Sequence, residues 1–197
     1  YASSNQQYHA RVLLIEQHVV PGGCATTFKR KNFMIEVGLH EMDGLDKDDP
    51  KVKIFEDLDV FKNVEFIRVP EFYRFISKNV DIVIPDNYKR ATDILVERFP
   101  NEEKGIKKFF NVVIGMNKEI NKLPREKWKF IAFLPVFPLL YRSLMTREKG
   151  NLGDFLDSII KDEDLMLVLL ANLGYYHDNP YTMSMVFYAV AQGSYFS

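Results

Sequence analysis

The sequence lacks the residues that define several classes of protein. It has one cysteine, Cys24, in 197 residues, which excludes an internal disulfide framework and favours a reducing compartment. Its longest nearly apolar run, Phe130 to Tyr141, holds two prolines. That run is too short to cross about 30 Å of hydrocarbon at about 1.5 Å per residue. The sequence therefore predicts no transmembrane helix.

An excess of charge of one sign is also missing. The formal net charge is −1 at pH 7, which gives no global attraction to nucleic acid, and we expect no nucleic-acid partner. The four histidines show no metal-ligand spacing, so no metal site is expected. The first residues lack the basic and apolar blocks of a signal peptide, and the expected location is cytoplasmic or peripheral to a membrane.

Glycine is absent from the first part of the chain, where Gly22 is the first one. A dinucleotide-binding fingerprint places its glycines about 20 residues before the acid that binds a ribose. Only 15 residues precede the candidate acid, Glu16. We therefore expect a fragment that lacks the phosphate-binding loop and the helix N-terminus behind it.

What the sequence does contain is a strand-like run that ends in an acid. Arg11 to Glu16, "RVLLIE", is short and apolar, which predicts a buried strand. A carboxylate at that position can accept hydrogen bonds from both ribose hydroxyls. Pro21, Gly22 and Gly23 predict a turn whose backbone N–H groups can face a pyrophosphate. A solvated strand end and an ordinary Pro-Gly turn remain the alternatives.

The rest of the chain predicts strands and then helices. "TTFKRKNFMIEVG" indicates two short strands, and residues 64–76 and 80–86 indicate two more. Helices are expected over 89–98, 102–122, from a start near Asp154, over 162–174 and over 181–192. The second of these places six apolar residues at helical spacing: Ile106, Phe109, Phe110, Val113, Met116 and Ile120. This order predicts an α/β or mixed α+β fold, in which part of a Rossmann-like sheet joins a substrate region with a β-sheet and several helices.

Residues 12–44, "VLLIEQHVVPGGCATTFKRKNFMIEVGLHEMDG", resemble the FAD-binding segment of phytoene desaturases, carotenoid isomerases and retinol saturases. The matching residues are Glu16, Gly22, Gly23, Phe28, Phe33, Glu36, Gly38 and His40. The likeness is looser but continues through most of the chain. Cys24 stands where many relatives have an arginine, although the retinol saturase branch also carries a small residue there.

The resemblance implies an FAD-dependent oxidoreductase that acts on C–C bonds of apolar isoprenoid, retinoid or carotenoid substrates. Residues 1–44 would be a partial FAD-binding segment, and 45–197 a substrate-binding region, incomplete at its C-terminal end. The cofactor-binding residues that it implies are Glu16 and Gln17 near the ribose, Gly22, Gly23, Thr26 and Thr27 along the pyrophosphate and flavin, and Gly38 and His40 near the flavin ring or the substrate entry.

No catalytic residue is assigned, and the 197 residues alone are expected to be inactive and to bind FAD weakly. The alternative is a non-catalytic module that binds an apolar ligand, or a truncated product without activity. Upstream coding sequence would discriminate between these hypotheses.

The run from Phe130 to Tyr141 has two interpretations. Trp128 and Tyr141 mark its ends, and basic residues flank it, which suits peripheral contact with a membrane. The alternative, which we expect, is a proline-broken segment inside the fold, lining a substrate tunnel or packing in the core. Either interpretation is compatible with an apolar substrate.

Overall fold

The computed structural model describes residues 11, 13–23, 25–38, 41–45, 49–124, 126–145 and 150–196. The chain divides into two compact units, Tyr1–Phe66 and Ile67–Ser197. The predicted boundary between residues 44 and 45, and the roles assigned to its two sides, stay predictions. Helices and short antiparallel strands occur together, which confirms the mixed α/β class.

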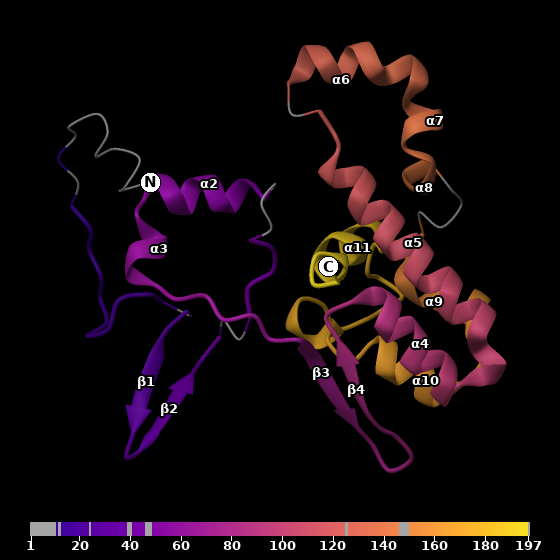
Figure 1. Ribbon diagram of the computed structural model, residues 1–197, viewed down its shortest axis with the longest axis horizontal. Coiled ribbons are helices and arrows are strands. Elements are labelled where there is room, and N and C mark those ends of the chain that lie inside the picture. Colours follow the sequence, from indigo (N-terminus) through magenta and orange to yellow (C-terminus); the bar gives the residue numbers. More distant parts are fainter. Residues whose placement is uncertain are drawn as a thin grey trace. The chain divides into compact units, whose positions relative to one another are not determined.

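The described residues of the first unit form a β-hairpin and two helices (Figure 1). Strands β1 (Thr27–Arg30) and β2 (Phe33–Glu36) pair antiparallel, with Arg30 opposite Phe33, which confirms the two predicted strands. Helices α2 (Pro50–Asp57) and α3 (Val60–Asn63) follow. The rings of Phe55, Phe61 and Phe66 lie 5.5–5.9 Å apart and form a small aromatic cluster beside these helices.

The predicted strand from Arg11 to Glu16 is wrong within the described residues. Residues 11 and 13–16 have no strand structure, and Leu13, Leu14 and Ile15 are 78–82% exposed. A strand needs a neighbouring strand to accept and donate its backbone hydrogen bonds. No segment that the structure describes pairs with this one, so its apolar sequence does not make it a strand.

The second unit is built around α5 (Glu103–Asn121), which contacts α4 (Tyr88–Arg98), α9 (Leu152–Ile159) and α11 (Met185–Gly193) (Figure 1). A two-stranded sheet of β3 (Glu71–Ile76) and β4 (Asp81–Pro85) packs against α4. The predicted helix over 102–122 is confirmed. Its six apolar residues face the core, where Ile120 alone among them is half-buried rather than buried. The remaining elements are η1 (Pro100–Glu102), α6 (Lys127–Phe133), η2 (Leu134–Val136), α7 (Phe137–Leu140), α8 (Arg142–Met145), α10 (Glu163–Leu169) and η4 (Leu173–Tyr175).

Several predicted boundaries in this unit are corrected. The third strand begins at Glu71 rather than at residue 64, the helix over 162–174 ends at Leu169, and the last helix begins at Met185. Asn151, not Asp154, caps α9, because its side-chain oxygen accepts a hydrogen bond from the Asp154 amide at 2.7 Å. An N-cap residue has extended backbone, and its side chain accepts from an amide two or three positions later. Asn151 meets both conditions.

The run from Phe130 to Tyr141 folds as the end of α6, η2 and α7, with Pro135 inside η2 and Pro138 in the first turn of α7. Most of its described apolar side chains are exposed, among them Ile131 at 65% and Leu139 at 85%. The expectation that this run packs inside the fold is therefore wrong for these side chains. None of the helices among the described residues has the length and apolar content needed to cross a membrane.

Candidate cofactor-binding segment

The predicted ribose-binding acid, Glu16, lies on an exposed stretch of the first unit. Its Oε1 accepts a hydrogen bond from the His18 amide at 3.0 Å, and His18 Nδ1 accepts one from the Val20 amide at 3.2 Å. Gln17 lies between them and is exposed. In the part of the chain that the structure describes, the side-chain hydrogen bonds of Glu16 stay within this local turn, so its carboxylate faces solvent.

The glycine pair that follows requires backbone that other residues rarely adopt. Gly22 has φ +125° and Gly23 has φ +58°. The turn closes through a 3.0 Å hydrogen bond from the Ala25 amide to the Gly22 carbonyl. A Cβ at Gly22 would lie 2.8 Å from the Ala25 carbonyl oxygen, whereas one at Gly23 would meet no atom within 4 Å. Gly22 therefore makes the turn, and Gly23 leaves its outer side open to a ligand. Cys24 lies outside the described residues.

The hairpin brings three more predicted residues together. Thr27 opens β1 opposite Glu36, and the Val37 amide donates to the Thr26 carbonyl at 3.1 Å. Oε1 of Glu36 accepts from the Gly38 amide at 3.0 Å. Thr26, Thr27 and Gly38 therefore share the base of the hairpin, directly after the glycine turn. His40 lies outside the described residues.

Sequence reasoning missed an ionic cluster just beyond this hairpin. Lys51 Nζ lies 3.1 Å from Asp43 Oδ1 and 3.2 Å from Asp49 Oδ2, while Asp49 Oδ1 caps α2 by accepting from the Lys51 amide at 2.8 Å. Partial burial acts to raise the pKa of Asp49, but hydrogen bonds from Lys51 and Leu45 hold it below its ordinary value. An aspartate directly before a proline is a helix-start signal that points to Asp49. The cluster closes the loop. Among the described residues, no three His, Cys, Asp or Glu side chains lie together as they would around a metal ion.

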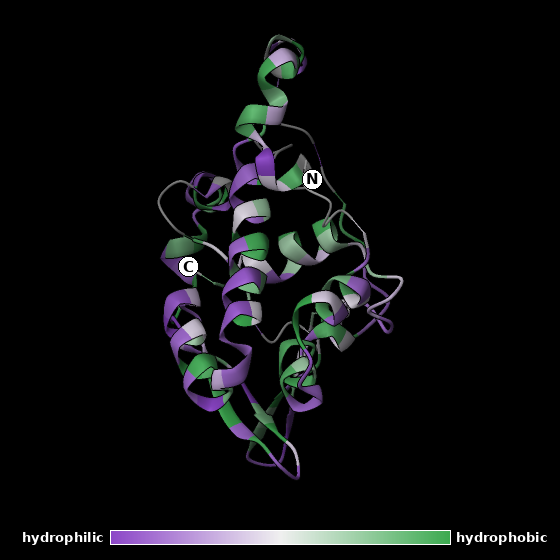
Figure 2. Ribbon diagram, turned by 90° about the vertical axis from the view of Figure 1, so that its right-hand side faces the viewer, coloured by the Kyte–Doolittle hydropathy of each residue, from purple (hydrophilic) through white to green (hydrophobic). Residues whose placement is uncertain are grey.

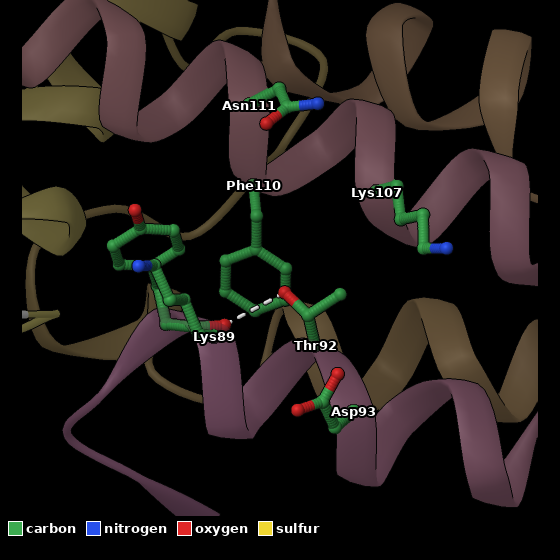
Figure 3. Close-up of a pocket in the computed structure, with 7 residues that line it drawn as sticks. Lys89, Thr92, Asp93, Lys107, Phe110 and Asn111 are labelled. Carbon is green, nitrogen blue, oxygen red and sulfur yellow. Dashed lines mark hydrogen bonds between the residues drawn. The ribbon is translucent and has the colours of Figure 1, made fainter.

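A pocket of about 400 Å³ lies between α4 and α5 of the second unit (Figure 3). Its lining residues are Tyr88, Lys89, Thr92, Asp93, Lys107, Phe110 and Asn111. Thr92 Oγ1 donates to the Tyr88 carbonyl at 2.7 Å, and charged side chains form much of the rim. This lining suits a small polar solute better than an apolar chain. The lining residues lie about one helical turn apart on α4 and on α5. The sequence could not predict this pocket, because it does not show that these two helices pack against each other.

Residues 1–58 match a family described as an NAD(P)-binding Rossmann-like domain. Prolycopene isomerases 1 and 2 of an Oncidium hybrid cultivar are each 29% identical over 164 residues, covering 80% of this chain and 28% of theirs. All-trans-retinol 13,14-reductase of Danio rerio is 28% identical over 193 residues, covering 86% of this chain and 30% of that protein.

A further Danio rerio protein, an inactive all-trans-retinol 13,14-reductase, is 24% identical over 156 residues, covering 77% of this chain and 24% of its own. The chain thus spans less than a third of the length of these curated relatives. No solved structure matches it. The matches show that the chain is similar in sequence to prolycopene isomerases and to all-trans-retinol 13,14-reductases, and that its first 58 residues are similar to NAD(P)-binding Rossmann-like domains.

Proposed function

We propose that the chain carries part of the FAD-binding and substrate-binding regions of an oxidoreductase that desaturates, saturates or isomerises C–C bonds. Its substrates would be apolar isoprenoids of the carotenoid or retinoid type, as the names of the prolycopene isomerase and retinol reductase relatives suggest. One observation carries the proposal. An exposed carboxylate, Glu16, is followed at the family's spacing by a turn with two glycines at positive φ.

The residues of this segment have chemistry that fits an adenine dinucleotide. The Glu16 carboxylate can accept hydrogen bonds from two ribose hydroxyls, and its charge disfavours a 2′-phosphate. Gly22 and Gly23 carry no side chain, so the backbone can approach a pyrophosphate closely. Gln17, Thr26, Thr27, Gly38 and His40 complete the proposed cofactor-binding set. Bound flavin would supply the hydride chemistry, while the protein binds and orients the cofactor and its substrate.

The first step of the test is to read the coding sequence upstream of Tyr1. We expect an in-frame Gly-X-Gly-X-X-Gly motif between a strand and a helix, and we expect the longer protein to purify with the visible absorbance of bound FAD. The 197 residues alone should retain little FAD, because no glycine-rich phosphate-binding motif precedes Glu16 within them. A stretch without that motif, or a longer protein that binds no flavin, would count against the proposal.

Glu16→Ala in the longer protein tests the ribose contact directly. Loss of hydrogen bonds to a charged acceptor costs about 1.5–3 kcal/mol, so the FAD dissociation constant should rise roughly ten- to hundredfold. Glu56→Ala is the matched control, because Glu56 is an exposed glutamate on α2 of the same unit. Equal FAD occupancy in the two variants contradicts the role of Glu16.

A second candidate is a non-catalytic module that binds an apolar ligand, or a product without activity. The relative that is named an inactive retinol reductase supports keeping it. Trp128 is the single tryptophan of the chain, so its fluorescence can report ligand binding. Retinoid binding by a protein that holds no flavin would favour this candidate over the enzyme.

A further inference from the structure

Residues 127–140, which form α6, η2 and α7 and which we call the apolar arm, present an apolar surface to solvent. The arm lies at the top in Figures 1 and 2, and Figure 2 colours much of it as hydrophobic. Its exposed apolar side chains include Trp128 at 66% and Leu139 at 85%; the others are Phe130, Ile131, Leu134, Val136 and Leu140. A contiguous exposed patch of large apolar side chains marks an interaction surface rather than a core.

The foot of the arm is fixed to the second unit. Tyr141 is buried, and its hydroxyl donates to the Lys122 carbonyl at 3.3 Å. The Glu119 carboxylate accepts from the amides of Ser143 and Leu144 at 2.8 and 2.9 Å, which ties α8 to α5. These bonds hold the C-terminal end of the arm against α5.

Aromatic rings of the arm and of Tyr141 pack on one another, although Phe130 stays 38% exposed. The centroid of Phe137 lies 6.0 Å from that of Phe130 and 4.4 Å from that of Tyr141. The aliphatic side chains on the outside have no comparable packing among the described residues, as the 85% exposure of Leu139 shows. The arm therefore combines aromatic rings that pack on one another with aliphatic side chains that are exposed.

Charge distinguishes this surface from the rest of the protein. Residues 121–142 contain five Lys or Arg and one Glu, a net charge of +4, in a chain whose formal net charge is −1. Lys129 pairs with Glu126 at 2.7 Å, and its Nζ lies 5.3 Å from the Trp128 ring centroid. Lys122 and Lys127 are exposed beside the apolar side chains. Cations therefore border the apolar surface.

We propose that the apolar arm docks on an anionic lipid bilayer, with its outer side chains at the boundary between headgroups and acyl chains. Apolar side chains bordered by Lys and Arg, with an aromatic ring at the edge, match the layered chemistry of such an interface. The prolines at 135 and 138 keep the helical pieces short, so the arm lies along the surface rather than across it. A second copy of the chain fits less well, because residues 121–142 carry a net charge of +4 in each copy and would repel each other. The proposal goes beyond the proposed function and does not depend on a cofactor.

The single tryptophan allows a direct test with the 197-residue chain, because Trp128 lies on the arm itself. We expect its emission to shift to the blue on mixing with vesicles of phosphatidylcholine and phosphatidylglycerol, and to be quenched by lipids brominated on their acyl chains. Vesicles of phosphatidylcholine alone, or added salt, should weaken binding. Absence of vesicle binding, or binding that leaves Trp128 unshifted and unquenched, overturns the proposal.

Two variants identify the surface that docks. Leu139→Glu should reduce vesicle partitioning at least about tenfold, because a leucine that would insert into the bilayer is replaced by a charge that anionic lipid repels. Leu167→Glu is the matched control, since Leu167 is 53% exposed on α10 of the same unit. Equal losses in the two variants contradict the proposal. A Trp128 shift that depends on protein concentration without lipid identifies a second copy as the occupant and also overturns it.

Discussion

Gly105, near the start of α5, is the position where a single added methyl group should disturb the second unit most clearly. It is buried, and a Cβ there would overlap the Ile159 carbonyl oxygen and lie 2.7 Å from Cδ1 of Ile160. The obstacle is the end of α9, which Glu102 holds in place by accepting from the amides of Lys161 and Asp162 at 3.0 Å each. Backbone tied in this way cannot move aside without breaking hydrogen bonds.

The change in the free energy of unfolding that we expect for Gly105→Ala is the sum of two opposing effects. Replacing glycine with alanine inside a helix stabilises it by about 1 kcal/mol, while overpacking a tight contact costs about 1–3 kcal/mol. Because the contact at Gly105 is with backbone, we place its cost at the upper end, so Gly105→Ala should lower the free energy of unfolding by about 2 kcal/mol. Gly115→Ala in the same helix is the matched control. Its Cβ would lie 2.7 Å from the Ser143 hydroxyl, and that side chain can rotate, so the change should be neutral or stabilising by up to about 1 kcal/mol.

Urea denaturation followed by far-ultraviolet circular dichroism measures both variants, because helices of the second unit dominate that signal. The expected order of stability is Gly115→Ala, then the unmodified chain, then Gly105→Ala. A Gly105→Ala variant as stable as Gly115→Ala would refute the close approach of α5 and α9.

Two further predictions concern a buried phenol and a strained turn. Burial, reinforced by the nearby phenols of Tyr176 and Tyr73, raises the pKa of Tyr188 well above its ordinary value of 10.0, and its hydroxyl donates to the Leu169 carbonyl at 2.9 Å. The stability from this group is complete below pH 10 and falls as the pH rises above it, because the unfolded chain releases the proton first. Tyr188→Phe should therefore cost about 1–3 kcal/mol at neutral pH and give a shallower alkaline loss in urea denaturation, and an unchanged alkaline slope would argue against this role. Lys31 turns the hairpin with φ +54°, so Lys31→Gly should stabilise β1 and β2 by about 1 kcal/mol and slow their amide hydrogen exchange; faster exchange would contradict the strain.

The sequence predicted an element correctly where the local residue pattern and the packing in the folded protein favour the same structure. The apolar spacing from Ile106 to Met116 predicts α5, because the same residues that repeat with the helical period also fill the core. The β1–β2 hairpin was predictable from two short strand-like runs around a polar turn. In the candidate site, the glycine turn was predictable because positive φ strongly favours glycine.

Other features depend on neighbours that a sequence does not specify. The apolar run before Glu16 resembles a strand, yet no described segment supplies the hydrogen bonds that a strand requires. The ionic cluster of Lys51 with Asp43 and Asp49 depends on a loop that returns to its own helix cap. The pocket between α4 and α5 exists only because two helices pack with their polar residues on one rim.

By itself, the sequence determined the family likeness, the helical period of α5 and the glycine turn, since each depends on residue types at short spacing. The tertiary structure decided where the run from Phe130 to Tyr141 lies, because its apolar sequence led us to expect a place inside the fold and most of its described side chains are exposed. An apolar composition indicates that a segment is more stable away from water. It does not indicate which other surface covers the segment. Here the rings of Phe130, Phe137 and Tyr141 pack on one another, and the aliphatic side chains of the same run remain exposed.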